Sequence, residues 1–331
     1  MNRLISTLCV AILFVLIVVT IICVGGRRAP KELRLAYVMS PGGTSHAGAE
    51  KFAELVKERT QGTINVRLYP SGVLGNDRIL VESLALRGVD MVLTGTALIG
   101  WYAPEYGVLE APFLFRDYQH LDRVLSGRIG KDIEAAINRK RGIHFLAHFH
   151  RGPRYLTTTA KKIHAPRDLK GLKLRVPELP VYIQSWAMFG ANPTPVAYND
   201  MFMALKQGVV EGQENPLEVI YTSHLHEVQN FVMETRHLLG FYTVAVGDHF
   251  FQKYSRQEER ILTEAITEAA AYQNGLLADY EKEYRNKLAE SGVEFVDVDR
   301  DAFEQLALQT LPPAFENEWA PGIFETIRNV Q

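Results

Sequence analysis

Apolar and polar positions alternate with two different periods through the first hundred residues. Residues 64–68 place apolar side chains at every second position, which predicts a half-buried strand, and residues 33–38 predict another. Between them, residues 49–56 repeat apolar side chains at i, i+3, i+4 and i+7, the spacing of an amphipathic helix. A second helix over 77–87 and a buried strand over 89–93 follow. Strand, helix, strand, helix and strand in this order predict a doubly wound α/β domain, whose ligands gather beyond the carboxyl ends of the strands.

The second half of the chain repeats this rhythm. Leu172, Leu174 and Val176 point toward one face of a strand over 171–176, which Pro177 ends. The other expected elements are a helix over 181–189, a helix capped by Asn199 and Asp200 that runs to 207, a strand into 211–215, a helix opened by Pro216, and extended segments over 231–239 and 241–246.

One predicted helix is unusually long. Ser255 and Glu258 form a capping-box pattern, and the helical stretch that they open runs to about residue 291, where Gly292 ends it. About 36 helical residues would extend roughly 54 Å. Because this length exceeds one domain of ordinary size, we expect the helix to cross two domains.

The N-terminal segment has the features of a secretion signal. Residues 4–24 carry no charge, and Arg3 and Arg27-Arg28 flank them. About 21 helical residues span roughly 30 Å, enough to cross a bilayer. Residues 1–30 are therefore either a cleaved signal peptide or a retained membrane anchor, and in both cases we expect the rest of the chain in the periplasm.

Composition narrows the classes of function. The formal net charge is −2, and no long basic run follows the N-terminal segment, so we expect no nucleic-acid partner. Cys9 and Cys23 both lie in the apolar segment, which leaves the body without a disulfide framework. No Gly-x-Ser-x-Gly elbow, His-Glu-x-x-His or P-loop occurs, so we expect neither an enzyme nor a bound cofactor.

Arg175 is the most informative candidate for binding. It lies at the end of the predicted strand 171–176, on the face opposite the apolar set. A guanidinium at a strand terminus near a crevice can hold a carboxylate by two parallel charged hydrogen bonds. Taken alone, the residue fits a solvent-exposed surface arginine better than a binding residue.

Arg175 lies in one of five motifs that are spaced along the chain. The motifs occupy residues 68–75, 152–157, 171–178, 192–198 and 211–216. With its motifs in this order and at this spacing, the chain resembles the substrate-binding subunit of tripartite ATP-independent periplasmic (TRAP) transporters, the DctP family. The resemblance runs from about residue 33 to near the C-terminus.

The resemblance implies a fold and a division into domains. The fold would be a two-domain α/β clamp like that of periplasmic binding proteins, with a long helix that spans both domains. Its backbone would cross between the domains more than once. We therefore expect residues 31–152 with 241–280 to form the first domain, and 153–240 with 281–331 to form the second.

The resemblance also assigns binding roles to three residues. Arg175 would form a bidentate salt bridge with the carboxylate of an organic acid. Arg154, in a Gly-x-Arg motif, would be the second cation, unless it forms a structural salt bridge between the domains. Asn215 matches an asparagine that contacts ligand in the family, although an asparagine before Pro216 also suits a turn.

Four further residues complete the expected site. Tyr198 corresponds to an aromatic position that closes against the ligand, or else it packs in the core. Asp77 aligns with an acidic contact, or caps a helix. His237 matches a pocket-lining histidine, and we expect His150 or its neighbour Arg151 to tune specificity, because many relatives carry Trp and Asn in this segment.

Two histidine pairs raise the question of a metal. His148 and His150 are spaced to share one face of a strand, but no third ligand follows at a metal-site spacing. His224 and His226 fall in a predicted helix, where residues i and i+2 do not face each other. We therefore expect no metal site.

The expected function is the capture of a small organic acid and its delivery to TRAP membrane subunits by a monomeric protein. Sialic-acid binders carry a glutamate where this chain has Gly95. The polar candidates Asp77, Tyr198 and His237 favour a sugar acid such as a uronate or an aldonate. A C4-dicarboxylate or keto acid is the alternative ligand, and a membrane-tethered ligand sensor with the same fold is the alternative role.

Overall fold

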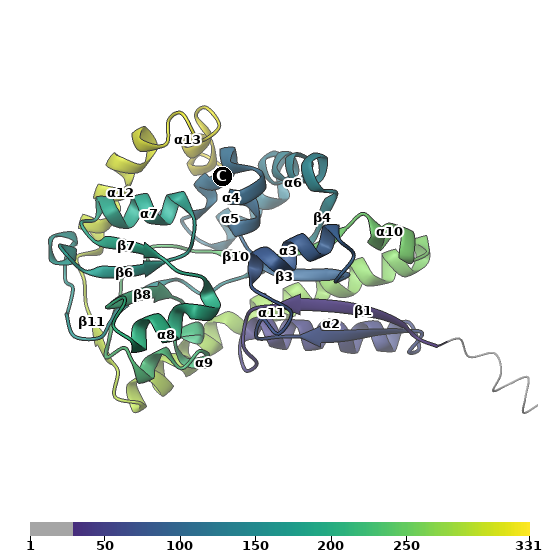
Figure 1. The fold of residues 1–331 in the computed structure, drawn as a ribbon. Helices are drawn as coiled ribbons and strands as arrows, with labels where there is room; N and C mark the ends of the chain where they lie inside the picture. The colour runs from purple at the N-terminus through teal and green to yellow at the C-terminus, as the bar shows by residue number, and fades with distance from the viewer. Residues whose placement is uncertain (1–28) are drawn as a thin grey trace, which may run out of the picture.

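A computed structural model describes residues 29–331, which fold around two separate β-sheets (Figure 1). The apolar segment 4–24, predicted to be a signal peptide or membrane anchor, lies outside these residues. Within 29–331, no helix combines the length and the apolar character needed to cross a membrane.

The first sheet has five strands in the order β2-β1-β3-β10-β4, and the elements around it are called the first lobe. Strand β1 pairs in parallel with β2 and β3, as the predicted strand–helix alternation requires, whereas β10 is antiparallel to both β3 and β4. The strands are β1 (Lys31–Tyr37), β2 (Ile64–Tyr69), β3 (Met91–Gly95), β4 (Ile143–His150) and β10 (Phe241–Gly247). The helices are α2 (Thr44–Arg59), α3 (Asp77–Ala85), α4 (Ala97–Tyr102), η1 (Pro104–Glu110), α5 (Tyr118–Ser126), α6 (Arg128–Arg141) and α10 (His249–Lys253).

The second sheet has six strands in the order β11-β9-β5-β8-β6-β7 and forms the second lobe. Strand β5 is antiparallel to β8 and β9, and β6 is parallel to β7 and β8. The strands are β5 (Tyr155–Thr158), β6 (Lys173–Val176), β7 (Asn192–Pro195), β8 (Gly212–Asn215), β9 (Phe231–Met233) and β11 (Glu294–Val296). The helices are η2 (Pro166–Leu169), α7 (Pro180–Met188), η3 (Tyr198–Asp200), α8 (Met201–Lys206), α9 (Leu217–Thr222), η4 (Leu225–Glu227) and α12 (Arg300–Ala314).

The predicted long helix is confirmed as α11 (Arg256–Glu290), which has 35 residues. The capping box is present: Glu258 N–H donates to Ser255 Oγ at 3.3 Å, and Ser255 N–H donates to a Glu258 carboxylate oxygen at 2.7 Å. The helix packs against α2 and β4 in the first lobe and against α9 in the second (Figure 1). It therefore belongs to both lobes, as its length predicts.

The chain ends on the first lobe. Helix α13 (Ile323–Arg328) packs against η1, and Arg116 donates hydrogen bonds to the carbonyls of Arg328 and Val330 at 2.5 and 2.6 Å. The expected assignment of all of 281–331 to the second domain therefore differs from the structure at this last helix.

A side chain of the second lobe reaches the first residue of helix α2. The Glu218 carboxyl on α9 lies beside Gly43, just before this residue, and burial raises its pKa, against the lowering effect of Thr44. A Cβ atom on Gly43 would lie 2.3 Å from a Glu218 oxygen, so only glycine allows the close approach. Beside it, Tyr284 on α11 donates to the carbonyl of Gly42 at 2.6 Å.

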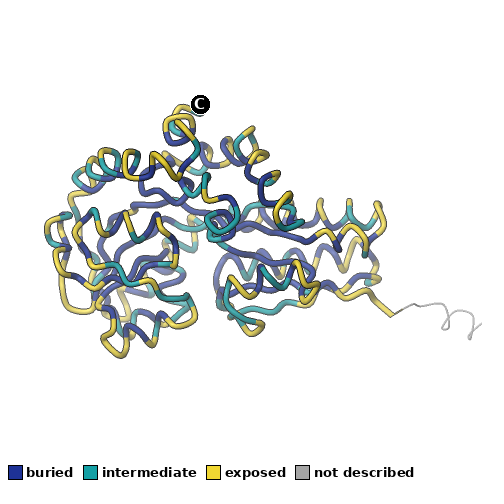
Figure 2. The backbone as a smooth tube through the Cα atoms, turned by 45° about the horizontal axis from the view of Figure 1, so that its top comes forward, coloured by how far each residue is buried: buried dark blue, intermediate teal, exposed yellow. Residues whose placement is uncertain are grey.

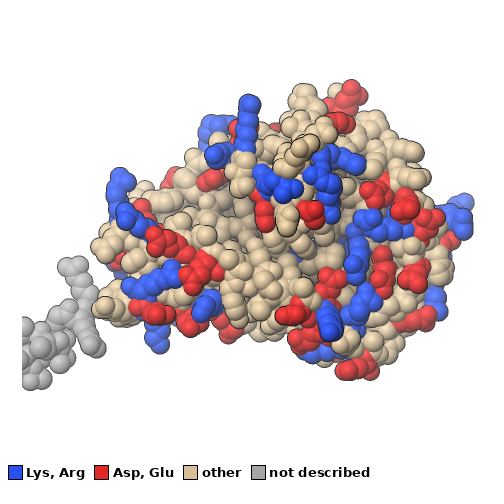
Figure 3. Space-filling model, turned by 180° about the vertical axis from the view of Figure 1, so that it is seen from behind, with Lys and Arg blue, Asp and Glu red and all other residues tan. Residues whose placement is uncertain are grey.

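Burial follows the predicted periodicity. The strands of both lobes are buried along most of their length, and the outer turns of the helices alternate between buried and exposed (Figure 2). Seen from behind, cationic and anionic side chains are interspersed over the surface (Figure 3). Exposed ion pairs such as Lys162–Glu294, at 2.6 Å, contribute little to stability.

Candidate functional site

A cavity lies between the two lobes, with an empty volume of about 800 Å³, part of it open to solvent. It is found where β1, β3, β6 and β8 end, the position expected for a ligand of an α/β protein. The first lobe contributes Asp77, Glu110 and Tyr242, and the second contributes Arg175, Tyr198 and Asn215.

Arg175 lies at this cavity with only 3 % of its surface exposed. Its neighbours Leu174 and Val176 in β6 are fully buried. The Arg175 Nε and Nη2 atoms donate to the carbonyl of Val196 at 2.9 and 2.7 Å, which fixes the plane of the guanidinium. Burial lowers its pKa to about 10, so the group is still a cation at neutral pH. The N–H groups of Nη1 remain for a ligand carboxylate.

Arg154 forms a buried ion pair with Glu214, and both side chains are almost completely inaccessible. Arg154 Nε and Nη2 donate to the Glu214 carboxylate, and Nη2 also donates to the Glu214 carbonyl at 2.6 Å. Burial acts to raise the pKa of Glu214, but the charge and hydrogen bonds of Arg154 outweigh it and lower this pKa to about 2. The partner lies on β8, beside β5, so this salt bridge forms within the second lobe.

His237 is buried behind Glu214 and is not among the residues that line the cavity. Its Nε2 lies 3.1 Å from a Glu214 carboxylate oxygen, and its Nδ1 lies 2.8 Å from the hydroxyl of Thr235. Burial lowers its pKa, so the imidazole is neutral at neutral pH. The structure thus places this predicted pocket residue in a supporting position.

Asn215 and Tyr198 both line the cavity. Asn215 Nδ2 donates to Gln213 at 2.6 Å, and its Oδ1 receives only a long contact, 3.5 Å, from Arg151 Nη2. The Tyr198 hydroxyl is 2.7 Å from the hydroxyl of Ser223, and burial raises its pKa to about 12.

Asp77 lies on the cavity at the first turn of α3, but it is not the cap of that helix. Asn76 is the cap, and its side chain accepts the backbone N–H of Ile79 at 3.0 Å. Asp77 instead accepts the Thr94 hydroxyl at 2.9 Å with one oxygen. Burial raises its pKa, against the opposing effects of the Thr94 bond and of the charges of Arg151 and Arg175.

Glu110 and Tyr182 are cavity residues that the sequence analysis missed. Glu110, on η1, is 4 % exposed, and the Tyr182 hydroxyl on α7 donates to one of its oxygens across the lobes. Burial raises the pKa of Glu110, with the charge of Arg151 acting against it. Neither residue lies in a recognisable motif, and only the fold brings η1 to α7.

Three buried N–H groups of the cavity lining have no acceptor within residues 29–331. They are Trp101 Nε1, Arg151 Nε and Arg154 Nη1. A buried donor without a partner costs on the order of 1–3 kcal/mol. Together with Arg175, these groups form a site that a ligand rich in acceptor oxygens would satisfy.

His150 lies outside the cavity lining. Its Nε2 is 2.7 Å from an Asp122 oxygen, and its ring stacks on Tyr118 with centroids 4.5 Å apart. Its neighbour Arg151 lines the cavity instead. His148 is enclosed between Phe145 and Phe241, and burial lowers its pKa to about 4.

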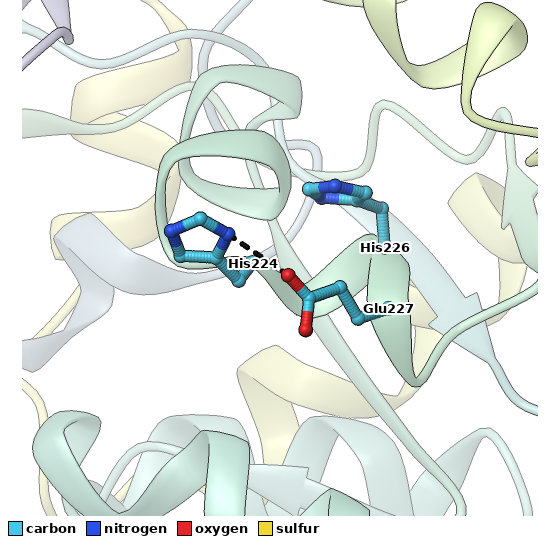
Figure 4. A group of neighbouring side chains, drawn as sticks. All are labelled: His224, His226 and Glu227. Carbon is cyan, nitrogen blue, oxygen red and sulfur yellow. Dashed lines mark ion pairs between the residues drawn. The ribbon is translucent and has the colours of Figure 1, made fainter.

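The helix predicted around His224 is wrong, because α9 ends at Thr222 and His224 adopts the left-handed conformation with φ of 57°. This turn brings His224, His226 and Glu227 together, with their ligating atoms within 4.8 Å of one another (Figure 4). His224 Nδ1 is 3.1 Å from a Glu227 oxygen, and His226 stacks on Tyr221. The trio lies on the surface of the second lobe, largely exposed and away from the cavity.

Two lobes that enclose a cationic cavity between them define a solute-binding protein. Residues 35–317 match bacterial extracellular solute-binding protein family 7 (DctP), and the chain belongs to this family, as its motifs predict. It is a solute-binding protein of the TRAP type, and the family consists of binding proteins.

The similarity to characterised relatives extends over most of the chain. A solute-binding protein of Roseobacter denitrificans is 36% identical over 275 residues, covering 83% of this chain and 84% of that protein. The 2,3-diketo-L-gulonate-binding periplasmic protein of Escherichia coli is 32% identical over 276 residues, with 83% and 84% covered.

Solved structures confirm the fold. The Roseobacter denitrificans TRAP protein with bound L-galactonate superposes with a TM-score of 0.84 at 32% identity, covering 91% of this chain and 99% of that one. A TRAP protein of Sulfurospirillum deleyianum with bound succinate superposes with a TM-score of 0.87 at 27% identity, covering 92% and 100%.

Breaking the buried ion pair should be costly. We expect Glu214→Gln to lower the free energy of unfolding by about 3–5 kcal/mol, because the Arg154 charge would remain buried without its partner. Urea unfolding measures the effect. Glu294→Gln, which removes the exposed pair with Lys162, is the matched control and should cost less than about 1 kcal/mol. Equal effects of the two substitutions would contradict the structural role given to Glu214.

The same pair predicts a dependence on pH. The folded-state pKa of Glu214, about 2, lies below its ordinary value of 4.5, so its contribution to stability is complete above pH 4.5 and is lost as the pH falls toward 2. The difference in unfolding free energy between the wild type and Glu214→Gln should therefore shrink between pH 6 and pH 3. A difference that stays constant over this range would show that the carboxylate is not held ionised by Arg154.

Proposed function

We propose that the chain captures a sugar acid, a uronate or an aldonate, between its lobes and delivers it to TRAP membrane subunits. The observation that carries this proposal is the set of unpartnered N–H groups in the cavity together with the free edge of Arg175. An anion with several oxygens supplies the acceptors that these donors lack.

The proposed ligand contacts divide into two kinds. Arg175 binds the carboxylate through Nη1 and Nη2, and Arg154 adds Nη1, the one nitrogen that Glu214 leaves free. Asn215 offers its Oδ1 to a hydroxyl, and Tyr198 packs against the carbon skeleton. Asp77, whose second oxygen is not used by Thr94, accepts from a hydroxyl.

The two histidines take supporting roles in this proposal. His237 fixes the Glu214 carboxylate and so the plane of Arg154, and His150 fixes the chain just before Arg151. Because the contacts come from both lobes, the ligand stabilises the arrangement in which the lobes are close together.

The ligands of relatives support a sugar acid. L-Galactonate is bound in the Roseobacter denitrificans structure, and the E. coli relative binds 2,3-diketo-L-gulonate according to its name. The Sulfurospirillum deleyianum protein holds succinate, which makes a C4-dicarboxylate the alternative ligand. Both classes carry the carboxylate that Arg175 would bind.

We further propose that the protein acts as a monomer in the periplasm and without enzymatic activity. Membership of an extracellular solute-binding family supports this location. The alternative role is that of a membrane-tethered sensor, in which residues 4–24 would be retained.

A thermal-shift screen with sugar acids, dicarboxylates and keto acids tests the ligand class. A ligand at 100 times its dissociation constant adds about 2.7 kcal/mol of stability, a readily measured increase in melting temperature. We expect sugar acids to give the largest increase, and Arg175→Ala to weaken their binding at least about 30-fold in calorimetry.

Arg236→Ala is the control for this substitution, since Arg236 is half-exposed and lies outside the cavity. It should bind the same acids as the wild type does. Stabilisation by neutral sugars alone, or unchanged affinity in Arg175→Ala, would refute the carboxylate assignment.

The mature N-terminus separates a mobile carrier from a tethered sensor. We expect the intact mass of the protein recovered from the periplasm to correspond to a start near Arg27. A mass that includes residues 4–24, with the protein in the membrane fraction, would instead support the sensor.

A further inference from the structure

Arg151 lines the cavity and has a hydrogen-bond donor that other residues do not use. It follows β4 at the crossing to the second lobe, where its backbone N–H donates to Gly240 at 2.9 Å and its carbonyl accepts the Tyr118 hydroxyl. Its guanidinium lies over the ring of Tyr242, 4.6 Å from the centroid. The backbone and the head group are thus held in place, yet Nε has no acceptor within residues 29–331.

Two carboxyls of the first lobe lie within electrostatic reach of this guanidinium. Burial raises the pKa of both Asp77 and Glu110, and the charge of Arg151 opposes this in each case. Arg175 also acts on Asp77, and Arg154 also acts on Glu110. Among residues 29–331 each carboxyl has one hydrogen-bond donor, Thr94 for Asp77 and Tyr182 for Glu110, and therefore keeps acceptor capacity for a ligand.

The charged groups around Arg151 determine which kind of ligand group can bind beside it. In their ionised forms, Asp77 and Glu110 repel a second carboxylate that Arg151 attracts, and such a carboxylate has no proton to donate to either. A hydroxyl group accepts from Arg151 Nε–H and donates to a carboxylate at the same time. The Nη1 end of the guanidinium faces Gly95, where the missing side chain leaves space: a Cβ atom there would lie 3.6 Å from Nη1.

We propose that Arg151 is a specificity-determining residue that selects hydroxylated monocarboxylates over unsubstituted dicarboxylates. It donates to a hydroxyl oxygen of the ligand, and that hydroxyl donates to Asp77 or Glu110. The inference rests on the proposed function, in which Arg175 holds the single carboxylate.

Calorimetry with L-galactonate and succinate tests the inference in two variants. Arg151→Met removes the charge and all donors, and Arg151→Lys keeps the charge but removes the planar fork and its Nε–H. We expect both substitutions to weaken L-galactonate binding by about tenfold or more and to change succinate binding by less than about threefold. The preference for the sugar acid should therefore fall sharply.

Arg141→Met is the matched control. Arg141 also lies over a tyrosine, Tyr102, at 4.6 Å, and bonds to Glu82, but it is outside the cavity. It should leave both affinities unchanged. Melting temperatures of all variants show whether each is folded, and Arg151→Lys keeps the test valid if Arg151→Met is unstable.

Three results would overturn the inference. Equal weakening of both ligands would mean that Arg151 acts only by general attraction of anions. Greater weakening of succinate would mean that it binds a second carboxylate. Unchanged L-galactonate affinity would mean that it makes no ligand contact. Failure of the proposed function is distinct, because the wild type would then bind no sugar acid in the first place.

Discussion

The salt bridge between Arg154 and Glu214 is the interaction on which the rest of the site depends. An isolated charge at this depth would be very unfavourable, and each residue makes the burial of the other tolerable. The bridge joins β5 to β8, so it also fixes the strand end that presents Asn215 to the cavity. His237 completes it by bonding to the same carboxylate. This paired guanidinium lines the cavity, and its Nη1 has no hydrogen-bond acceptor within residues 29–331.

The cavity offers a ligand both hydrogen-bond donors and hydrogen-bond acceptors. Among residues 29–331, the cavity donors that lack acceptors are nitrogen atoms of Trp101, Arg151 and Arg154, and Arg175 adds a charged group for a carboxylate. The acceptors with spare capacity are the carboxyls of Asp77 and Glu110, which come from the opposite lobe. A ligand with an anionic end and several hydroxyls satisfies both sets, whereas a purely anionic or purely neutral ligand satisfies one. This complementarity exists only when the lobes are close enough to share the cavity.

Features that depend on residues close together in the sequence could be predicted from it. Alternation of apolar residues located the strands, a capping box located the long helix, and strand-end position identified Arg175 and Asn215. Pairings between distant segments escaped prediction: Glu214 is bonded to an arginine 60 positions away through an antiparallel register that no motif records. The same limit applies to His237, whose place behind that carboxylate depends on tertiary packing. His224 was misjudged because a single left-handed residue ends the helix that its neighbours favour.

The path of the chain has a consequence for how such proteins diversify. Strands of the first sheet come from residues 31–150 and 241–247, those of the second from 155–233 and 294–296, and the last helix returns to the first lobe. No continuous piece of the gene therefore encodes one complete lobe. Recombination cannot exchange a lobe as a module without disrupting both cores. New ligand preferences must instead arise by substitution of single residues that line the cavity and do not stabilise the fold.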